Sequence, residues 1–221
     1  MNLALFDLDH TLLPIDSDYE WSRFLAGSGH VDPIRFASEN ERFAREYHAG
    51  TLDITEFLAF QLGPLAAVPR DELDRLHEQY MATVVLPAIR PVARELVRHH
   101  QAAGDLCAIV TATNEYVTGP IARAFGVEHL IGARVEEIDG RITGRSPGTP
   151  SFREGKVTRV DEWLAMLGHA WDDFPVSTFY SDSINDLALL ERVSRPVATN
   201  PDARLAAIAG ERGWPIRRLF E

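Results

Sequence analysis

The sequence predicts an α/β fold, with a doubly wound parallel sheet, helices on both faces and a helical insertion after the first strand. Short, mostly apolar runs of the kind found in buried parallel strands recur along the chain. Segments with helical periodicity separate these runs, and this alternation is typical of a parallel sheet covered on both faces. One long stretch, residues 14–86, shows helical patterns but no strand. An insertion therefore separates the first strand from the rest of the sheet.

Four apolar runs are predicted as strands of this sheet. They are Leu3–Phe6, Leu106–Val110, Val176–Tyr180 and the weaker run Pro196–Thr199. A separate hairpin is predicted within His129–Thr143, because two extended segments there flank an Asp-Gly dipeptide that favours a tight turn.

Helices are predicted from apolar stripes, several of which end at a glycine. Between the strands these stripes are Pro91–Gln101, Glu115–Phe125 and the segment from Val157 to Leu167. Inside the insertion they lie around Tyr19–Leu25, Ile54–Phe60 and Leu73–Val84. We therefore expect a core domain made of residues 1–13 and 87–221, and a helical cap domain made of residues 14–86.

Composition and charge restrict the class of protein. Hydrophobic residues make up 45% and charged residues 25% of the 221 residues, the ordinary balance of a globular protein. The net charge of −11, with no stripe of Lys and Arg to offset it, argues against a nucleic-acid partner. No signal-peptide core and no apolar span of about 18 residues is visible, so we expect no membrane partner and a cytoplasmic location. The single cysteine, Cys107, lies in an apolar run and is expected to be a buried, reduced thiol.

Two acidic residues, Asp7 and Asp9, directly follow the first predicted strand. Catalytic groups of open parallel sheets gather beyond the carboxyl ends of the strands, where these two residues lie. One carboxylate could attack a phosphorus atom while the other supplies and removes a proton. Taken alone, such a pair more often ends a strand or caps a helix.

Three further signals lie beside other predicted elements. Asp182 and Asp186 come after the third strand and can complete an oxygen site for Mg²⁺ together with the first acidic pair. Thr111 follows the second strand, where its hydroxyl and nearby backbone N–H groups can bind phosphoryl oxygens. Lys156 precedes an amphipathic helix and can bring an ammonium group to the site. Capping or surface exposure would explain any one of these residues, but not four acids in two strand-end clusters.

The ordered set Asp-x-Asp-x-Thr, hydroxyl, Lys and Asp-x-x-x-Asp resembles the haloacid dehalogenase-like hydrolase superfamily. The resemblance covers essentially the whole chain. The details Asp7-Leu-Asp-His-Thr-Leu and Asp182-Ser-Ile-Asn-Asp are most similar to the branch that contains phosphoserine phosphatase and histidinol phosphatase. The resemblance implies a Rossmann-like core with a small cap inserted after the first motif. It also implies a phosphatase that acts on small phosphate monoesters with Mg²⁺ as its cofactor.

The resemblance further implies a role for each residue of the set. Asp7 is the nucleophile that becomes an aspartyl-phosphate. Asp9 protonates the leaving alcohol and then activates water, which requires a raised pKa at that carboxyl group. The implied metal ligands are Asp7, the backbone carbonyl of Asp9, and Asp182. The implied phosphate-binding residues are Thr111, Ala112 and Lys156, and the supporting residues are Asp186, Asn185 and Thr11.

The cap is expected to choose the alcohol half of the substrate. The phosphoserine enzymes that the chain resembles carry a cap Glu nine residues after the nucleophile, where this chain has Asp16. Asp16 or Asp18 could meet a substrate ammonium, or could simply cap a helix. No residue convincingly matches the cap Arg that would bind a substrate carboxylate; Arg42 and Arg45 are expected on a solvated helix face. Histidinol phosphate is therefore slightly favoured over phosphoserine.

Other functions would use a similar set of residues. A phosphotransferase or mutase would pass the phosphoryl group to a second alcohol in place of water, and the sequence leaves this alternative open. A phosphoacceptor signalling module or a silent binding protein is more remote. Signalling modules are roughly half as long and lack the helical insertion.

Overall fold

The protein is built on a six-stranded parallel sheet. The computed structural model describes residues 1–220, so Glu221, the last residue of the predicted core range, lies outside the described residues. The strands are β1 (Leu3–Phe6), β2 (Leu106–Asn114), β3 (His129–Ala133), β6 (Ser177–Ser181), β7 (Arg195–Thr199) and β8 (Ile216–Arg217). Their order is β3-β2-β1-β6-β7-β8, and every neighbouring pair is parallel. The winding direction changes at β1, and ligands of such sheets bind where this change occurs.

The central strand shows why its sequence is continuously apolar. Leu3 and Leu5 belong to one core cluster, while Ala4 and Phe6 belong to the other, because successive side chains of a strand point to opposite faces. All four are fully buried. A strand covered on both faces has no solvent side, so the polar alternation of a surface strand is absent.

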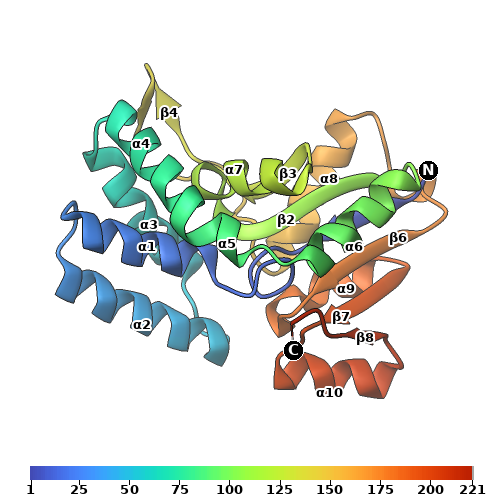
Figure 1. Cartoon of the computed structure of the whole chain (residues 1–221). Coiled ribbons are helices and arrows are strands. Elements are labelled where there is room, and N and C mark those ends of the chain that lie inside the picture. The colour runs from blue at the N-terminus through green and yellow to red at the C-terminus, as the bar shows by residue number, and fades with distance from the viewer. Residues whose placement is uncertain (221) are drawn as a thin grey trace.

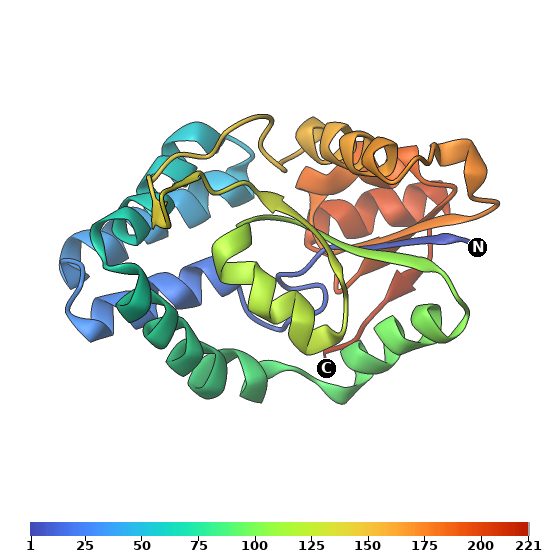
Figure 2. The ribbon, with the colours of Figure 1, turned by 90° about the horizontal axis from the view of Figure 1, so that it is seen from above.

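The helices fall into two groups: some cover both faces of the sheet, as predicted, and the others belong to the insertion between β1 and β2. In chain order they are α1 (Ser17–Ser28), α2 (Pro33–Ala49), α3 (Ile54–Ala67), α4 (Arg70–Tyr80), a π-helical turn (Met81–Val85), α5 (Leu86–Ala88), α6 (Pro91–Ala102), α7 (Glu115–Phe125), α8 (Glu154–Met166), α9 (Leu187–Arg192) and α10 (Ala203–Arg212), with 3₁₀ turns at Trp171–Asp173 and Ile184–Asp186. Helices α6 and α7 pack on the face of Phe6, and α8, α9 and α10 pack on the face of Leu5. Figure 2 shows these two groups, green and orange to red, on opposite sides of the strands.

The insertion between β1 and β2 begins with four helices that lie beyond the carboxyl ends of the strands (Figure 1). Asp16, Asp32 and Asp53 accept backbone N–H groups at the starts of α1, α2 and α3. Gly29 and Gly50 end the first two helices in the left-handed conformation. Local caps therefore fix the ends of helices that the sequence alone placed only coarsely.

The sheet is larger than the sequence predicted. The predicted hairpin is present as β4 (Glu137–Ile138) and β5 (Arg141–Ile142), but β3 at its amino-terminal side joins the main sheet. Strand β2 also continues beyond Val110 to Asn114, with a shift of register against β3. The short strand β8 was not predicted. These edge segments become strands because they pair with an existing neighbour, and a sequence pattern records that pairing poorly.

Two smaller expectations can also be compared with the structure. Cys107 is a buried free thiol, as predicted. Of the helices formed by residues 1–220, none combines the length and the apolar character needed to cross a membrane.

Candidate active site

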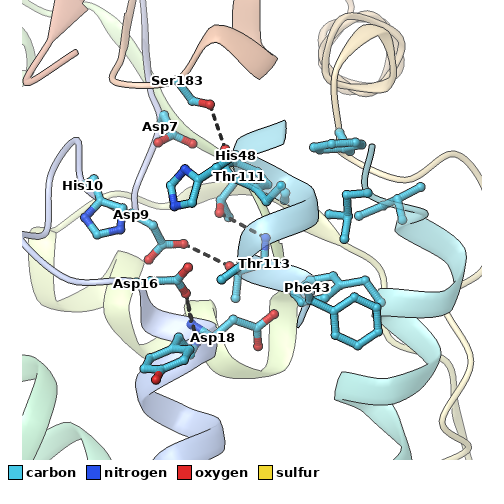
Figure 3. Close-up of a pocket in the computed structure, with 18 of the residues that line it drawn as sticks. Asp7, Asp9, His10, Asp16, Asp18, Phe43, His48, Thr111, Thr113 and Ser183 are labelled. Carbon is cyan, nitrogen blue, oxygen red and sulfur yellow. Dashed lines mark hydrogen bonds between the residues drawn. The ribbon is translucent and has the colours of Figure 1, made fainter. Parts of the chain in front are cut away.

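Three neighbouring strands, β2, β1 and β6, bring the predicted catalytic residues to one edge of the sheet. Phe6 at the end of β1 pairs in register with Ile109 of β2 and with Tyr180 of β6. The residues that follow these positions therefore come together although they are far apart in sequence. Asp7, Asp9, Thr111, Lys156 and Asp182 line one cavity at this edge. Figure 3 shows Asp7, Asp9 and Thr111 around it.

The first contact that defines the site is the buried ion pair between Lys156 and two carboxylates. The Nζ atom of Lys156 lies 2.8 Å from Oδ1 of Asp7 and 2.7 Å from Oδ1 of Asp186. Burial by itself lowers the pKa of Lys156, but the adjacent Asp186 and Asp7 carboxylates raise it overall. The ammonium therefore stays charged and is fixed beside the predicted nucleophile.

A tight turn places Lys156 there. A Cβ atom on Gly155 would overlap the carbonyl oxygen of Pro150, so only glycine allows the chain to approach so closely. Lys156 then lies in the first turn of α8 and is 3% exposed. The lysine that looked most like a surface residue in the sequence is thus a buried one.

Asp7 and Asp182 face each other across the hydroxyl of Thr11. This Oγ1 lies 3.0 Å from Oδ2 of Asp7 and 3.2 Å from Oδ1 of Asp182, and it accepts the backbone N–H of Asp182. Burial, then Asp7 and Asp186, raise the pKa of Asp182 well above its ordinary value. One ammonium thus faces the carboxylates of Asp7, Asp182 and Asp186, which leaves excess negative charge between Asp7 and Asp182.

This excess charge fits the predicted Mg²⁺ site. Hard cations bind carboxylate and carbonyl oxygens, and an added cation would offset the repulsion between Asp7 and Asp182. Within residues 1–220, no three His, Cys, Asp or Glu side chains are arranged as a metal-binding group. The predicted set requires only two carboxylates and the backbone carbonyl of Asp9, so the donor chemistry remains suitable.

Asp9 has the surroundings expected of a proton donor. Its Oδ1 accepts the backbone N–H of Ser17 at 2.7 Å, and its Oδ2 accepts the hydroxyl of Thr113 at 2.9 Å. Burial and then the Asp16 carboxylate raise the pKa of Asp9 to about 6, although Ser17 and Thr113 act in the opposite direction. A carboxyl group with this pKa can carry a proton in part of the population near neutral pH.

The predicted phosphate-binding segment lies at the end of β2. Thr111 is buried, and its Oγ1 accepts the N–H of Thr113 at 3.2 Å, which leaves its own hydroxyl hydrogen available to a ligand. Ala112 also lines the cavity. Asn114 caps α7 by accepting the N–H of Val117. Helix capping therefore explains Asn114 but not Thr111.

The supporting residues behind these groups have separate tasks. Asp186 accepts the hydroxyl of Ser181 as well as the Lys156 ammonium, and burial raises its pKa to about 6 although the ammonium opposes this. Asn185, unlike Asp186, does not hydrogen-bond to Lys156. Its side chain donates to the backbone carbonyl of Tyr47 and accepts from the side chain of Arg153. It therefore joins the insertion to the core.

The two acids that were considered for substrate recognition differ in their contacts. Oδ1 of Asp16 accepts the N–H groups of Asp18 and Tyr19 and so caps α1. Asp18 accepts the side-chain amide of Asn114 at 3.3 Å through Oδ1 only. Both acids line the cavity. Figure 3 shows Asp16 turned toward the start of the helix and the Asp18 carboxylate extending toward Phe43.

Several residues of the site were not identified from the sequence. Thr113 contacts Asp9, Ser181 contacts Asp186, and the Tyr47 hydroxyl donates to Ser183 at 2.9 Å. A hydroxyl two residues after Thr111 was the one available signal for Thr113. Tyr47 lies on the insertion and contacts the core only through folding, so no local pattern indicates it. Arg42 pairs with Glu39, Glu46 and Glu56 on the helix surface, as expected for a residue that is not a carboxylate clamp.

Comparisons with known proteins show the family of the chain. The model of the family described as haloacid dehalogenase-like hydrolase matches residues 4–191. The chain belongs to the haloacid dehalogenase-like hydrolase family. The sequence-based predictions of this family and of a phosphatase as the enzyme class are confirmed.

Similar members of the family include two phosphatases. A histidinol-phosphatase of Neisseria meningitidis serogroup C is 47% identical over 97% of each chain. A phosphoserine phosphatase of Mycobacterium tuberculosis is 33% identical over 97% of this chain and 70% of its own length.

Solved structures extend the comparison to the fold. A Bordetella pertussis Tohama I protein of unknown function matches with a TM-score of 0.94 and 55% identity, covering 99% of both chains. A phosphoserine phosphatase described as a phospho-aspartyl intermediate analogue matches with a TM-score of 0.68 and 19% identity, covering 100% of this chain and 94% of its own. The second likeness concerns the α/β fold alone, and it confirms the fold class predicted from the sequence.

Proposed function

We propose that this haloacid dehalogenase-like phosphatase hydrolyses a small phosphate monoester through an aspartyl-phosphate on Asp7. The main support is the arrangement at the strand ends, where one carboxylate oxygen of Asp7 contacts Lys156 and the other contacts Thr11. A phosphate group near Asp7 would meet the Lys156 ammonium and the free hydroxyl hydrogen of Thr111. These donors offset the repulsion between an anionic nucleophile and an anionic ester.

Mg²⁺ is part of this proposal. Asp7, the backbone carbonyl of Asp9, and Asp182 would bind it, and the bound ion would supply positive charge to neutralise the transferring phosphoryl oxygens. The remaining work belongs to side chains of the protein. Lys156 holds the phosphoryl group, Asp7 attacks it in line with the departing oxygen, and Asp9 moves the proton.

Asp9 would act twice in the reaction. It would first donate its proton to the leaving alcohol oxygen, and then take a proton from the water that attacks the aspartyl-phosphate. The hydrogen bonds from Ser17 and Thr113 fix the orientation of the carboxyl group throughout. Burial, which raises its pKa, allows the protonated form needed for the first step.

Replacement of Asp9 by Asn provides a prediction that separates these two steps. Asp9→Asn should lower kcat for alkyl phosphates by about 10²–10⁴-fold, because the alcohol oxygen loses its proton donor. The leaving group of p-nitrophenyl phosphate departs without protonation, so formation of the aspartyl-phosphate from this ester should be less affected. The aspartyl-phosphate should then accumulate, because the amide in Asp9→Asn cannot activate the water that hydrolyses it. Rapid quenching followed by intact-protein mass spectrometry measures this accumulation. Equal losses for both kinds of ester, with no accumulation, would indicate a structural role for Asp9.

For the substrate we favour histidinol phosphate over phosphoserine. Among the described residues that line the cavity, Lys156 is the single Lys or Arg, and it is committed to the phosphate end. The rest of the lining offers no arginine for a substrate carboxylate, but it does contain the acids Asp16 and Asp18. The similarity to a histidinol-phosphatase at 47% identity supports the same choice.

A panel of phosphate esters tests the proposal. The purified protein with Mg²⁺ is assayed for phosphate release from histidinol phosphate, phosphoserine, sugar phosphates and p-nitrophenyl phosphate. We expect the highest kcat/KM for histidinol phosphate. A preference for phosphoserine or for sugar phosphates would refute the substrate and leave the phosphatase chemistry in place. Transfer of phosphate to an added alcohol in preference to water would support the phosphotransferase alternative.

A further inference from the structure

Asp18 is a buried carboxylate with one oxygen that has no partner. Its side chain lies in the first turn of α1 and is 2% exposed. Oδ1 accepts the amide of Asn114, whereas Oδ2 is buried and forms no hydrogen bond within residues 1–220. Leaving a buried polar oxygen unpaired costs free energy, and the cost is larger for a charged group than for a neutral one. A ligand group that paired with this oxygen would recover that cost.

The surroundings of Asp18 favour a cation as that group. Burial raises the pKa of Asp18 well above its ordinary value, and the nearby carboxylates of Asp16 and Asp9 add to this effect. Positive side chains do not oppose them, since Lys156 is held by Asp7 and Asp186. The Asp16 and Asp9 carboxylates repel a charge on Asp18, so a ligand ammonium bonded to the free Oδ2 would relieve this repulsion and favour the ionised form of Asp18.

Asp16 is less suited to the same task although it lies closer to the position expected from related enzymes. Its Oδ1 already accepts two backbone N–H groups at the start of α1. Its side chain is only partly buried, so water can solvate its other oxygen without a ligand. The Oδ2 of Asp18 is buried away from water and has no partner, so a ligand ammonium gains more by pairing with it.

The wall beside Asp18 suits a flat ring that carries polar atoms. Ser22, one helical turn after Asp18, donates to Gln61 at 2.8 Å, and Gln61 donates to Asn40 at 3.2 Å. Asn40 and Gln61 both line the cavity, as do Phe43 and Phe57, whose rings pack edge to face. Buried amides next to aromatic side chains can hydrogen-bond the edge of a heteroaromatic ring while its faces make apolar contacts.

We propose that Asp18, and not Asp16, binds the ammonium group of the substrate, with the Asn40–Gln61 pair and the neighbouring phenylalanines receiving its ring. This inference rests on the proposed function, because it assigns the alcohol half of a phosphate ester whose phosphate lies at Asp7. It makes the residue eleven positions after the nucleophile, in the first turn of α1, the determinant of specificity.

The test compares two esters that differ by one group. Histidinol phosphate is assayed beside its des-amino analogue, which keeps the imidazole and the phosphate but lacks the ammonium. Wild-type protein should prefer histidinol phosphate by about ten- to a hundredfold in kcat/KM, the range expected of a charge-assisted hydrogen bond. Asp18→Asn should bring this ratio close to one, because the amide keeps the size of the side chain but not its charge.

Control variants separate this role from others. Asp53→Asn makes the same chemical change at an exposed helix cap of the insertion and should keep the full ratio. Asp16→Asn retains a good capping residue and should keep most of the ratio. If Asp18→Asn proves unstable, Asp18→Ser keeps an acceptor for Asn114 without the charge and provides the same comparison. Phosphoethanolamine, which has the ammonium but no ring, should be hydrolysed less efficiently than histidinol phosphate.

The possible outcomes distinguish this inference from the proposed function. A wild-type ratio near one, with p-nitrophenyl phosphate still hydrolysed, would overturn the recognition of an ammonium and leave the phosphatase intact. Equal losses for both esters in Asp18→Asn would reduce Asp18 to a structural partner of Asn114. Loss of the preference in Asp16→Asn alone would transfer the role to that residue. Failure to hydrolyse any ester in the panel would overturn the proposed function, and this assignment with it.

Discussion

Replacement of Asp7 by Asn is expected to abolish turnover, with a fall in kcat of about 10⁴-fold or more, the scale on which enzymes lose activity without their nucleophile. The amide cannot form the acyl phosphate, so the reaction loses its first covalent step. The fold should survive, because Lys156 keeps its contact with Asp186. Removing one of the charges that raise the pKa of Asp182 should also leave the melting temperature of the metal-free protein equal or higher.

Two measurements accompany that assay. Wild-type protein with Mg²⁺ should trap a beryllofluoride adduct on Asp7, visible by fluorine NMR, and Asp7→Asn should not. Circular dichroism and thermal melting test whether the variant is folded, with Asp53→Asn as a matched substitution away from the cavity. Substantial turnover by folded Asp7→Asn would refute the aspartyl-phosphate mechanism.

Removal of the metal should have an effect of comparable size. EDTA is expected to eliminate phosphate release, and added Mg²⁺ to restore it. Ca²⁺ should not restore it, because its larger and looser shell would misplace the carboxylate of Asp7. The physical reason is the excess charge at the site, where Asp7, Asp182 and Asp186 face one ammonium.

The same excess charge predicts a change in stability that needs no activity assay. Mg²⁺ at a hundredfold excess over its Kd should stabilise the folded protein by about 2.7 kcal/mol, or raise Tm by about 5–10 °C for a chain of this size. Asp182→Asn should lose most of this shift, whereas Asp53→Asn should retain it. Full activity in metal-free protein, or an equal Tm shift in Asp182→Asn, would contradict the proposed ligand set.

Much of the fold and of the candidate site could be predicted from the sequence because the information is local. A short, continuously apolar run such as Leu3–Phe6 is typical of a strand buried on both faces, and this run is fully buried. A parallel sheet then brings every strand end to one edge, so the residues after Phe6, Val110 and Tyr180 had to meet if those runs were neighbours. Which strands are neighbours was not predicted, and the structure places β1 between β2 and β6.

The weaker parts of the prediction lacked such local information. Strand β8 and the extension of β2 depend on pairing with a neighbouring strand, and their own residues do not require it. The burial of Lys156 depends on the close approach of Gly155 to Pro150, which the letters of the sequence do not reveal. The contact between Tyr47 and Ser183 joins the insertion to the core across more than a hundred residues.

The sequence by itself determined which chemical groups are present and at which strand ends they lie. Only the tertiary structure decided how each group is used. Asp16 and Asp18 are the same amino acid two positions apart, and the sequence does not distinguish them. In the structure, Asp16 accepts backbone N–H groups at the start of α1, whereas Asp18 has a buried oxygen without a partner. The difference arises because burial and hydrogen-bond partners depend on how α1 packs against α7 and against the other helices of the insertion. That packing exists only after the chain has folded.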